Sequence, residues 1–560
     1  MTSGMNSSLL LPLDMGPAAA SFRWKARVPQ LVWGFVLLGT LIRLIVYLQR
    51  FPLWVDECML AENFLDRDFS GLLAPLANEQ VAPVGFLWIE CALVKLFGFS
   101  EWSLRLYPLV CGIASLFVFR HLASRLLAGA PLVLAVGCLA VAKGPISLSA
   151  DCKPYASDLL VTTTLLALAV EWLSRPEQTR WLWALAAFVP VALLLSFPAV
   201  FVAGAVNAGL LVPVWRRRQR AVWGAFVACQ VALVGAFAVV LHHSCGPAFH
   251  DLHEFMEAYW TKQSGFPPLG DPLGLVAWLA QVHLGDKIFA VPYGAENGGG
   301  AVCFLCCVIG AVVAWRRGHR PLLTMLLATF ALGFVAAALH RYPYGGHQRL
   351  VQYLVPAVSL SVGMGAATGL AWIESLGGRR LLTQGLIVGL ALFGAGVCGR
   401  NLQRPYSFVL DDEHRTFARN FWRDEPGTLT VCCRTDLERR LSSGARLFYY
   451  RCNQRIYSRR HQVRERIPAA AFPLLARPVR LVVYAPPLES LDLWEVAECL
   501  KLFESRFDFA GYEEFRLPLA DDGFDKYGTY RVFRFEPRPI AAQRRLSARP
   551  LDQEVTTRFP

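Results

Sequence analysis

Two adjacent carboxylates, Asp56 and Glu57, stand beside Trp54 shortly after a run that is long enough to cross a bilayer. That run, residues 29–49, is apolar apart from Arg43, and a spanning helix needs about 20 mostly apolar residues. A carboxylate within hydrogen-bond reach of a hydroxyl group can take its proton while the oxygen attacks a carbon atom. An acidic pair just past a membrane helix is more often a solvated cap, so the pair alone decides nothing.

Basic and aromatic side chains form a second group of candidates. Lys153, Arg341 and Arg349 fall at the predicted outer ends of membrane helices, at the height of lipid headgroups, where a cation suits an anionic ligand. Snorkelling toward the membrane surface explains each of them equally well. Tyr155 and Tyr344 lie in the same segments. They can hydrogen-bond a polar ligand, although tyrosine is also common in the aromatic belt of membrane proteins.

Two further arginines, Arg105 and Arg43, lie near or within predicted spans. An ionisable residue in such a place is a functional candidate by default. For Arg43, a side chain that only reaches toward the outer surface is an equally good interpretation.

The elements that must position these residues are membrane helices. About eleven apolar runs are long enough to span or nearly span a bilayer. They are predicted at 28–49, 104–127, 131–149, 156–173, 181–195, 198–214, 221–242, 300–315, 321–339, 350–373 and 381–398.

The basic connectors between these runs all fall on one side. They are Arg23/Lys25/Arg27, Arg125, Arg175/Arg180, Arg216–Arg218 with Arg220, Arg316-Arg317 and Arg379-Arg380. By the positive-inside rule that side is the cytoplasm. We therefore expect a multi-pass protein of the plasma or inner membrane. Residues 50–103, 149–155, 243–299, 340–349 and everything after about 399 are expected to face outward.

Composition supports this fold class. Hydrophobic residues make up 55% of the 560 and charged residues only 17%, against roughly 25% charged in soluble domains. The continuous apolar runs indicate helices and not a barrel. A net charge of +13 is explained by loop anchoring, so we expect no nucleic-acid partner.

Past residue 400 the pattern becomes that of a soluble domain. Short strands are predicted at 429–433, 447–450, 479–484 and 530–535, with an amphipathic helix over 491–507. The predicted organisation is a cytoplasmic segment at 1–27, a transmembrane domain at 28–398 whose first outside loop is 50–103, a small extracytoplasmic α/β domain at 399–537 and a polar tail at 538–560.

Three other patterns favour structural roles. Cys303, Cys306 and Cys307 resemble a CxxC motif but lie inside an apolar run, where cysteine behaves as a small hydrophobe. His242-His243, His250 and His253 lack the carboxylate or cysteine that would complete a metal site. Gly365 and Gly369 are spaced for close packing of membrane helices.

The order of several motifs resembles the GT-C class of lipid-dependent membrane glycosyltransferases, especially the protein O-mannosyltransferase and lipid A aminoarabinose transferase group. The resemblance covers roughly residues 28–400. Its motifs are Trp54-Val-Asp-Glu57, Gln80-Val-Ala-Pro83, the 98–105 stretch, Lys153-Pro-Tyr155-Ala-Ser-Asp158 and the 341–356 stretch. The middle outside loop differs among branches of this class, so the identity of the acceptor does not carry over.

This resemblance implies an inverting transfer of a sugar from a polyprenyl-(di)phosphate carrier to an acceptor at the outer face. Asp56 would act as the base and Glu57 would support it. Lys153, Arg341 and Arg349 would hold the lipid phosphate, and Tyr155, Tyr344 and Arg105 would bind phosphate or sugar. The implied partners are the lipid-linked sugar donor, a glycan, lipid or protein acceptor, and membrane lipids. A divalent metal cofactor is left open.

Two alternatives belong to other classes of protein. A transporter or flippase would show inverted repeats and charges at the midplane of the bilayer, whereas these charges gather at one surface. A non-catalytic envelope assembly protein would have no need of Asp56 and Glu57.

Overall fold

The computed structural model describes residues 22–244, 246–289, 298–377, 381–403, 416–422, 427–432, 447–457, 477–485, 500, 503, 507–516 and 529–538. The chain divides into two compact units. The transmembrane unit comprises Met1–Phe51 and Asn63–Tyr406, and the C-terminal unit comprises Pro52–Glu62 and Ser407–Pro560. The predicted boundaries of the cytoplasmic segment, the outside domain and the polar tail stay predictions.

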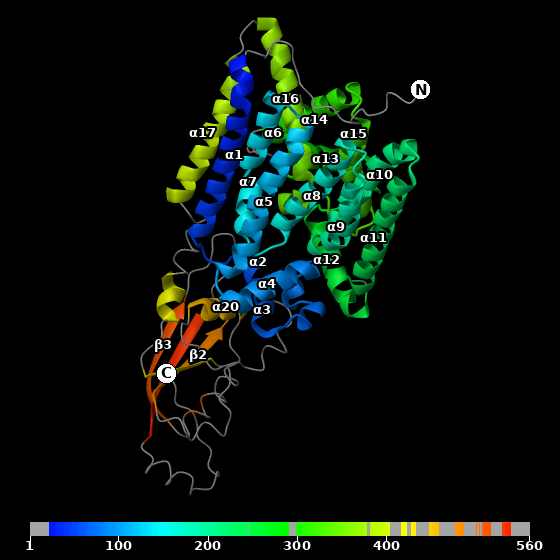
Figure 1. Cartoon of the computed structure of the whole chain (residues 1–560). Coiled ribbons are helices and arrows are strands. Elements are labelled where there is room, and N and C mark those ends of the chain that lie inside the picture. The colour runs from blue at the N-terminus through cyan, green and yellow to red at the C-terminus, as the bar shows by residue number, and fades with distance from the viewer. Residues whose placement is uncertain are drawn as a thin grey trace, which may run out of the picture. The chain divides into compact units, whose positions relative to one another are not determined.

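The transmembrane unit is a bundle of long helices (Figure 1). Its α-helices are α1 (Phe22–Leu48), α3 (Asn63–Asp66), α4 (Val84–Phe97), α5 (Ser103–Leu126), α6 (Ala130–Ala140), α7 (Lys143–Ser147), α8 (Tyr155–Ser174), α9 (Arg180–Leu195), α10 (Ala199–Arg217), α11 (Arg220–Ser244), α12 (His250–Lys262), α13 (Pro272–Leu284), α14 (Gly299–Arg316), α15 (Arg320–Ala338), α16 (Val355–Gly377) and α17 (Leu381–Gln403). Short 3-10 helices are η1 (Gly71–Leu73), η2 (Ala77–Glu79), η3 (Leu148–Ala150), η4 (Pro247–Phe249) and η6 (Gln348–Leu354).

The prediction of a polytopic helical membrane protein is confirmed. Within the described residues, nine helices are long and apolar enough to cross a membrane, or ten if a bent pair counts as one span. The one remaining predicted span, 181–195, forms α9. Its 16 residues reach only about 24 Å at 1.5 Å per residue. That length falls short of a hydrocarbon core about 30 Å thick.

The bent pair replaces the single helix predicted over 131–149. Helix α6 ends at Ala140, and the chain turns by 49° before α7 and η3 continue. A break inside a span frees carbonyl groups that must find a donor. The guanidinium Nη1 of Arg43 supplies it, because it donates to the carbonyl oxygen of Ala140 at 3.1 Å and to that of Gly39 at 3.0 Å.

Glycines set the closest helix contacts in the bundle. A methyl group at Gly365 on α16 would overlap the carbonyl oxygen of Cys306 on α14, so the prediction that Gly365 allows close packing is confirmed. The same prediction is wrong for Gly369, where a methyl group would meet open space.

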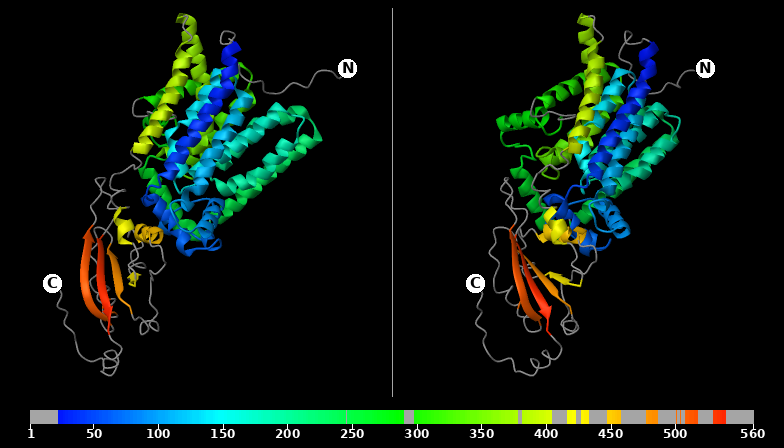
Figure 2. Two further views of the ribbon diagram at one scale, coloured as in Figure 1. Left: turned by 60° about the vertical axis from the view of Figure 1, so that its left-hand side comes forward. Right: turned by 90° about the vertical axis from the view of Figure 1, so that its left-hand side faces the viewer.

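Helix α17 lies beside α1 in the views of Figure 2 and contacts it.

The C-terminal unit contains a mixed four-stranded sheet in the order β1-β2-β4-β3. The strands are β1 (Leu429–Cys432), β2 (Val479–Ala485), β3 (Phe507–Arg516) and β4 (Thr529–Pro537). Strands β1 and β2 are parallel, and the other two pairs are antiparallel. Apolar side chains are buried on both faces, with Leu481 and Phe535 in one cluster and Val482 and Tyr530 in another.

The same unit also holds helices α2 (Val55–Ala61) and α20 (Leu447–Tyr457). The strand predicted at 447–450 is wrong, because these residues begin α20. Strands at 429–432, 479–485 and 529–537 match the prediction, and β3 was not predicted. The helix predicted over 491–507 lies almost wholly outside the described residues.

Candidate active site

The acidic pair opens helix α2. Asp56 is half-buried, whereas Glu57 is completely buried. The Glu57 carboxylate accepts a hydrogen bond from the backbone N–H of Trp54 at 3.2 Å, which satisfies one of the free donors at the start of the helix. The two neighbouring carboxylates therefore differ in setting: Glu57 holds the turn, and Asp56 is the one with solvent access.

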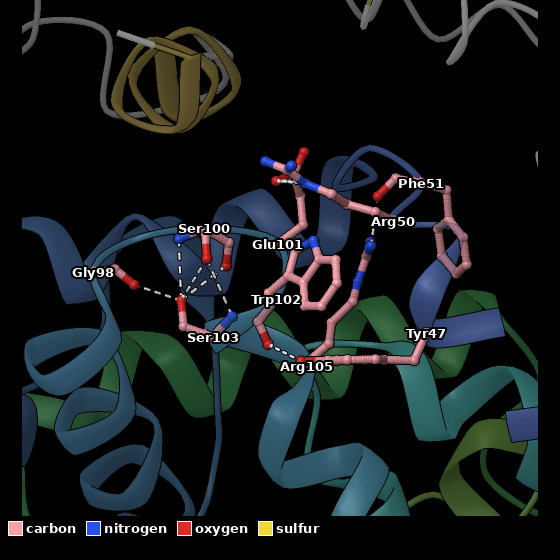
Figure 3. A network of polar contacts seen from close by, with 9 residues as sticks. All are labelled: Tyr47, Arg50, Phe51, Gly98, Ser100, Glu101, Trp102, Ser103 and Arg105. Atoms are coloured by element: carbon pink, nitrogen blue, oxygen red, sulfur yellow. Dashed lines mark hydrogen bonds and ion pairs between the residues drawn. The ribbon is translucent and has the colours of Figure 1, made fainter. Parts of the chain in front are cut away.

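The chain that leads into α2 is anchored at the end of α1 (Figure 3). Arg105, only 2% exposed, donates through Nη1 to the carbonyl oxygen of Phe51 and lies 4.4 Å from the centre of the Phe51 ring. Arg50 turns the backbone with a φ of 51° and pairs through Nε with Glu101 at 3.1 Å. Tyr47 donates to the carbonyl oxygen of Trp102 at 3.0 Å.

These contacts favour a positioning role for Arg105. Its side chain fixes the backbone of Phe51, the last residue of the transmembrane unit before α2. Direct binding of substrate by Arg105, which the resemblance implied, stays a prediction.

Lys153 lies in the segment just before α8, and its side chain is buried. It is 5% exposed, and its Nζ donates to Oε1 of Gln80 at 2.6 Å. Gln80 is presented by a strained turn, because Asn78 and Glu79 both have positive φ values, 58° and 48°. Non-glycine residues in this region cost free energy and gather at functional sites. A buried ammonium group at the edge of the bundle is suited to an anion.

Arg349 lies near two aromatic rings. Its guanidinium carbon is 5.9 Å from the centre of the Tyr155 ring and 5.9 Å from that of Trp260. Arg349 belongs to η6, which packs against α8, the helix that Tyr155 begins. Rings at this distance attract a guanidinium and help to orient it.

We call Lys153, Gln80, Tyr155, Arg349 and Trp260 the cationic cluster. Its members come from the segment before α4, the segment that enters α8, η6 and α12, and all of them belong to the transmembrane unit. Lys153 and Tyr155 are two residues apart, and the Arg349 guanidinium lies near the Tyr155 ring. Both cations are therefore linked to the segment that begins α8, and cations in such a place suit an anionic group.

The described contacts of Tyr344 and Arg341 do not involve the members of this cluster. Tyr344 is 2% exposed, and its hydroxyl group is 3.1 Å from Nε2 of His283. Because Nδ1 of His283 donates to the carbonyl oxygen of Leu279, Tyr344 donates to Nε2. Burial raises the pKa of Tyr344 and lowers that of His283, so both side chains stay neutral. Arg341 is exposed at the end of α15.

A polar hollow of about 180 Å³ lies on the same unit. It is lined by Lys262, Gln263, Ser264, Gln281, Val282, Lys287 and Gly346. Gly346, at a φ of +77°, faces the ring of Trp260 from the cationic cluster. Pockets for whole ligands measure roughly 300–1,000 Å³, so this hollow has room for a small polar group only.

Metal ligation finds no support in the described part of the chain, which contains no group of three or more His, Cys, Asp or Glu side chains placed to hold an ion. His253 instead bonds the carbonyl oxygen of Ser244 at 2.8 Å, and His250 faces Glu254. A divalent metal stays an untested prediction.

Two members of the cationic cluster were not predicted as site residues. Gln80 begins the motif Gln80-Val-Ala-Pro83, which is one of the motifs that resemble the family, so the sequence did point to this segment. Trp260 carries no such signal, because its place depends on how α12 packs against η2 near Gln80.

The bundle is that of a multi-pass membrane protein, and the cationic cluster is its candidate site for an anion. A family model described as dolichyl-phosphate-mannose-protein mannosyltransferase matches residues 81–242. This segment contains Lys153 and Tyr155, and over it the resemblance to the GT-C class of glycosyltransferases is confirmed.

Solved structures of similar fold include ArnT from Cupriavidus metallidurans bound to undecaprenyl phosphate, at 14% identity and a TM-score of 0.48, covering 92% of this chain and 98% of that chain. The oligosaccharyltransferase from Archaeoglobus fulgidus in its apo form matches at 10% identity and a TM-score of 0.44, covering 91% and 74%. Curated protein sequences give no match.

Proposed function

We propose that the protein is an inverting glycosyltransferase that moves a sugar from a polyprenyl-(di)phosphate carrier to an acceptor hydroxyl group at the outer face of the membrane. The observation that carries the proposal is the position of Lys153 and Tyr155, which lie inside the segment that matches the mannosyltransferase family and form part of the cationic cluster. A buried cation, together with a second cation near the Tyr155 ring, suits a phosphate leaving group.

In the proposed reaction the acceptor oxygen attacks the anomeric carbon of the lipid-linked sugar. The bond from that carbon to the phosphate oxygen breaks, and its electron pair leaves with the lipid phosphate. Lys153 and Arg349 would stabilise the charge that develops there, as fixed cations do for phosphoryl leaving groups. Asp56 would take the proton of the acceptor hydroxyl group, and one displacement inverts the anomeric centre.

The different settings of Asp56 and Glu57 support this division of roles. A general base must be reachable by the acceptor, and Asp56 has partial solvent access. Glu57 is completely buried and bonded to the Trp54 N–H, which suits a residue that fixes the helix carrying the base.

The test compares Asp56→Asn with Glu57→Gln in purified protein, using a labelled polyprenyl-linked sugar and a fixed acceptor. Asn keeps the size of Asp but cannot take the proton, so turnover should fall roughly 10²–10⁴-fold while donor binding, measured separately, stays intact. Glu57→Gln should lose less, because an amide oxygen still accepts from Trp54. Wild-type turnover by Asp56→Asn would refute the assignment of the base.

The outer-face placement is tested by topology reporters. The one-sided basic connectors support a C-terminal region outside the cytoplasm. Alkaline phosphatase fused after residue 400 should therefore be active, and a reporter that works only in the cytoplasm should be silent at the same position. The opposite pattern would contradict both the topology and the proposed site of transfer.

A further inference from the structure

The segment that carries the proposed base belongs to the C-terminal unit. Residues Pro52–Glu62 group with Ser407–Pro560, whereas the chain on either side of them, up to Phe51 and from Asn63 onward, belongs to the transmembrane unit. Asp56 and Glu57 therefore owe their surroundings in large part to residues about 400 positions later. The cationic cluster lies in the other unit.

Helix α2 cannot hold its own conformation. Its seven residues make about two turns, and isolated helices shorter than about 12 residues are marginal in water. Tertiary packing must supply the rest, and α2 packs against α20.

One contact between α2 and α20 joins a buried thiol on α20 to a backbone carbonyl oxygen on α2. Sγ of Cys452 on α20 lies 3.6 Å from the carbonyl oxygen of Cys58, and both cysteines are fully buried. Cys58 is two residues from Asp56 and closes the first turn of α2, because its N–H donates to the carbonyl oxygen of Trp54 at 3.0 Å. A displacement of Cys452 would thus act on the turn that holds the base.

Helix α20 is in turn fixed to the sheet. Tyr457, at its end, packs against a buried cluster that includes Phe421, Val482 and Tyr530. Residues 482 and 530 belong to β2 and β4, the two central strands. A continuous series of packed groups therefore runs from the sheet through α20 to the first turn of α2.

We propose that the C-terminal sheet domain positions the proposed base, through α20 and with Cys452 as the positioning residue. The inference rests on the proposed function of Asp56. Its physical basis is that a base must stand within hydrogen-bond reach of the acceptor, and a misplacement of about 1 Å can cost on the order of 100-fold in rate. The lipid donor is held by the other unit in this scheme, so its binding does not depend on Cys452.

The test replaces Cys452 by Leu, which overfills the α2–α20 contact, and by Ser, which keeps its size. We expect Cys452→Leu to lower kcat roughly 10- to 100-fold with donor binding within about twofold of wild type, and Cys452→Ser to restore most of the rate. Cys229→Leu is the matched control, since Cys229 is also a fully buried thiol but lies on α11 of the transmembrane unit. Unchanged kcat in Cys452→Leu would overturn the inference.

A second measurement separates positioning from general damage. If Cys452 acts only by placing Asp56, then Cys452→Leu should have no further effect on the residual turnover of Asp56→Asn, because residues that act as a unit are not additive. A full additional loss in the double variant would refute the positioning role. If Cys452→Leu fails to accumulate, Cys452→Ala decides: lower kcat with intact donor binding supports the inference, and wild-type kcat overturns it.

Failure of this inference differs from failure of the proposed function. Wild-type turnover by Asp56→Asn would remove the base itself, whatever the Cys452 variants do. An inactive Asp56→Asn beside fully active Cys452 variants would leave the proposed function standing and remove only the role of α20.

Discussion

Replacing Lys153 by Gln tests the cationic cluster most directly. Gln is one atom shorter than Lys and carries no charge, so the 2.6 Å bond from Nζ to Gln80 is lost together with any bond from that ammonium group to the phosphate. A hydrogen bond to a charged group contributes about 1.5–3 kcal/mol. At 1.36 kcal/mol per tenfold change in rate, kcat/KM for the lipid donor should fall about 13- to 160-fold.

The assay for Lys153→Gln is initial rate at limiting donor, with thermal unfolding of the same preparation measured in parallel. Arg341→Gln is the matched control, because it removes a cation from the exposed end of α15. We expect the loss in Lys153→Gln and Arg349→Gln and a much smaller one in Arg341→Gln. Wild-type kcat/KM for Lys153→Gln and Arg349→Gln would refute a phosphate site here, and equal losses in all three would show that Arg341 acts with them.

Two further predictions concern packing and pH. Gly365→Ala should destabilise the bundle by about 1–3 kcal/mol, as overpacking does, because a methyl group at this position meets the Cys306 carbonyl oxygen. Gly369→Ala should leave the melting temperature nearly unchanged, because a methyl group there meets open space. Similar melting temperatures for both variants would contradict the described contact of α14 with α16. Burial lowers the pKa of His283, so the folded protein binds a proton there less readily than the unfolded chain does. The contribution of the neutral side chain to stability is therefore lost as pH falls below about 6.5, the ordinary pKa of histidine. The melting temperature of His283→Gln should therefore change less than that of wild type between pH 7 and 5, and parallel curves would exclude a titration at His283.

The sequence was sufficient for the membrane helices and for some members of the candidate site. Long apolar runs have few alternative structures, and Lys153, Tyr155 and Arg349 are found because they stand in short segments at the ends of those runs. Trp260 could not be found in this way, because a ring in a polar helix reveals nothing of the arginine it will contact. Gln80 lay in a recognised motif, but its bond to Lys153 joins residues 73 positions apart.

The C-terminal unit was predicted less well than the membrane helices, for a different physical reason. The run Leu447-Phe-Tyr-Tyr has the aromatic composition of a strand, but a window of four residues is too short to separate a strand from the first turn of a helix, and α20 continues to Tyr457. Strand β3 was not predicted, because Asp508, Glu513 and Glu514 interrupt its apolar residues. Charges of this kind are common on an edge strand, which is the position of β3 in the sheet.

The bond between Arg43 and Ala140 has a consequence for the synthesis of the protein. Arginine costs at most about 2.5–3.5 kcal/mol on insertion, the figure for the centre of a span, and Arg43 lies near the end of α1. Its second carbonyl partner, Ala140, is made 97 residues later. At roughly 5–20 residues per second, helix α1 must wait about 5–20 s in the bilayer before Ala140 exists, and Nε and Nη2 of Arg43 have no hydrogen-bond partner among the described residues even afterwards. The leucine, isoleucine and valine side chains of α1 must hold the helix in place during that interval, and the arrival of α6 then locks the first helix of the nascent chain.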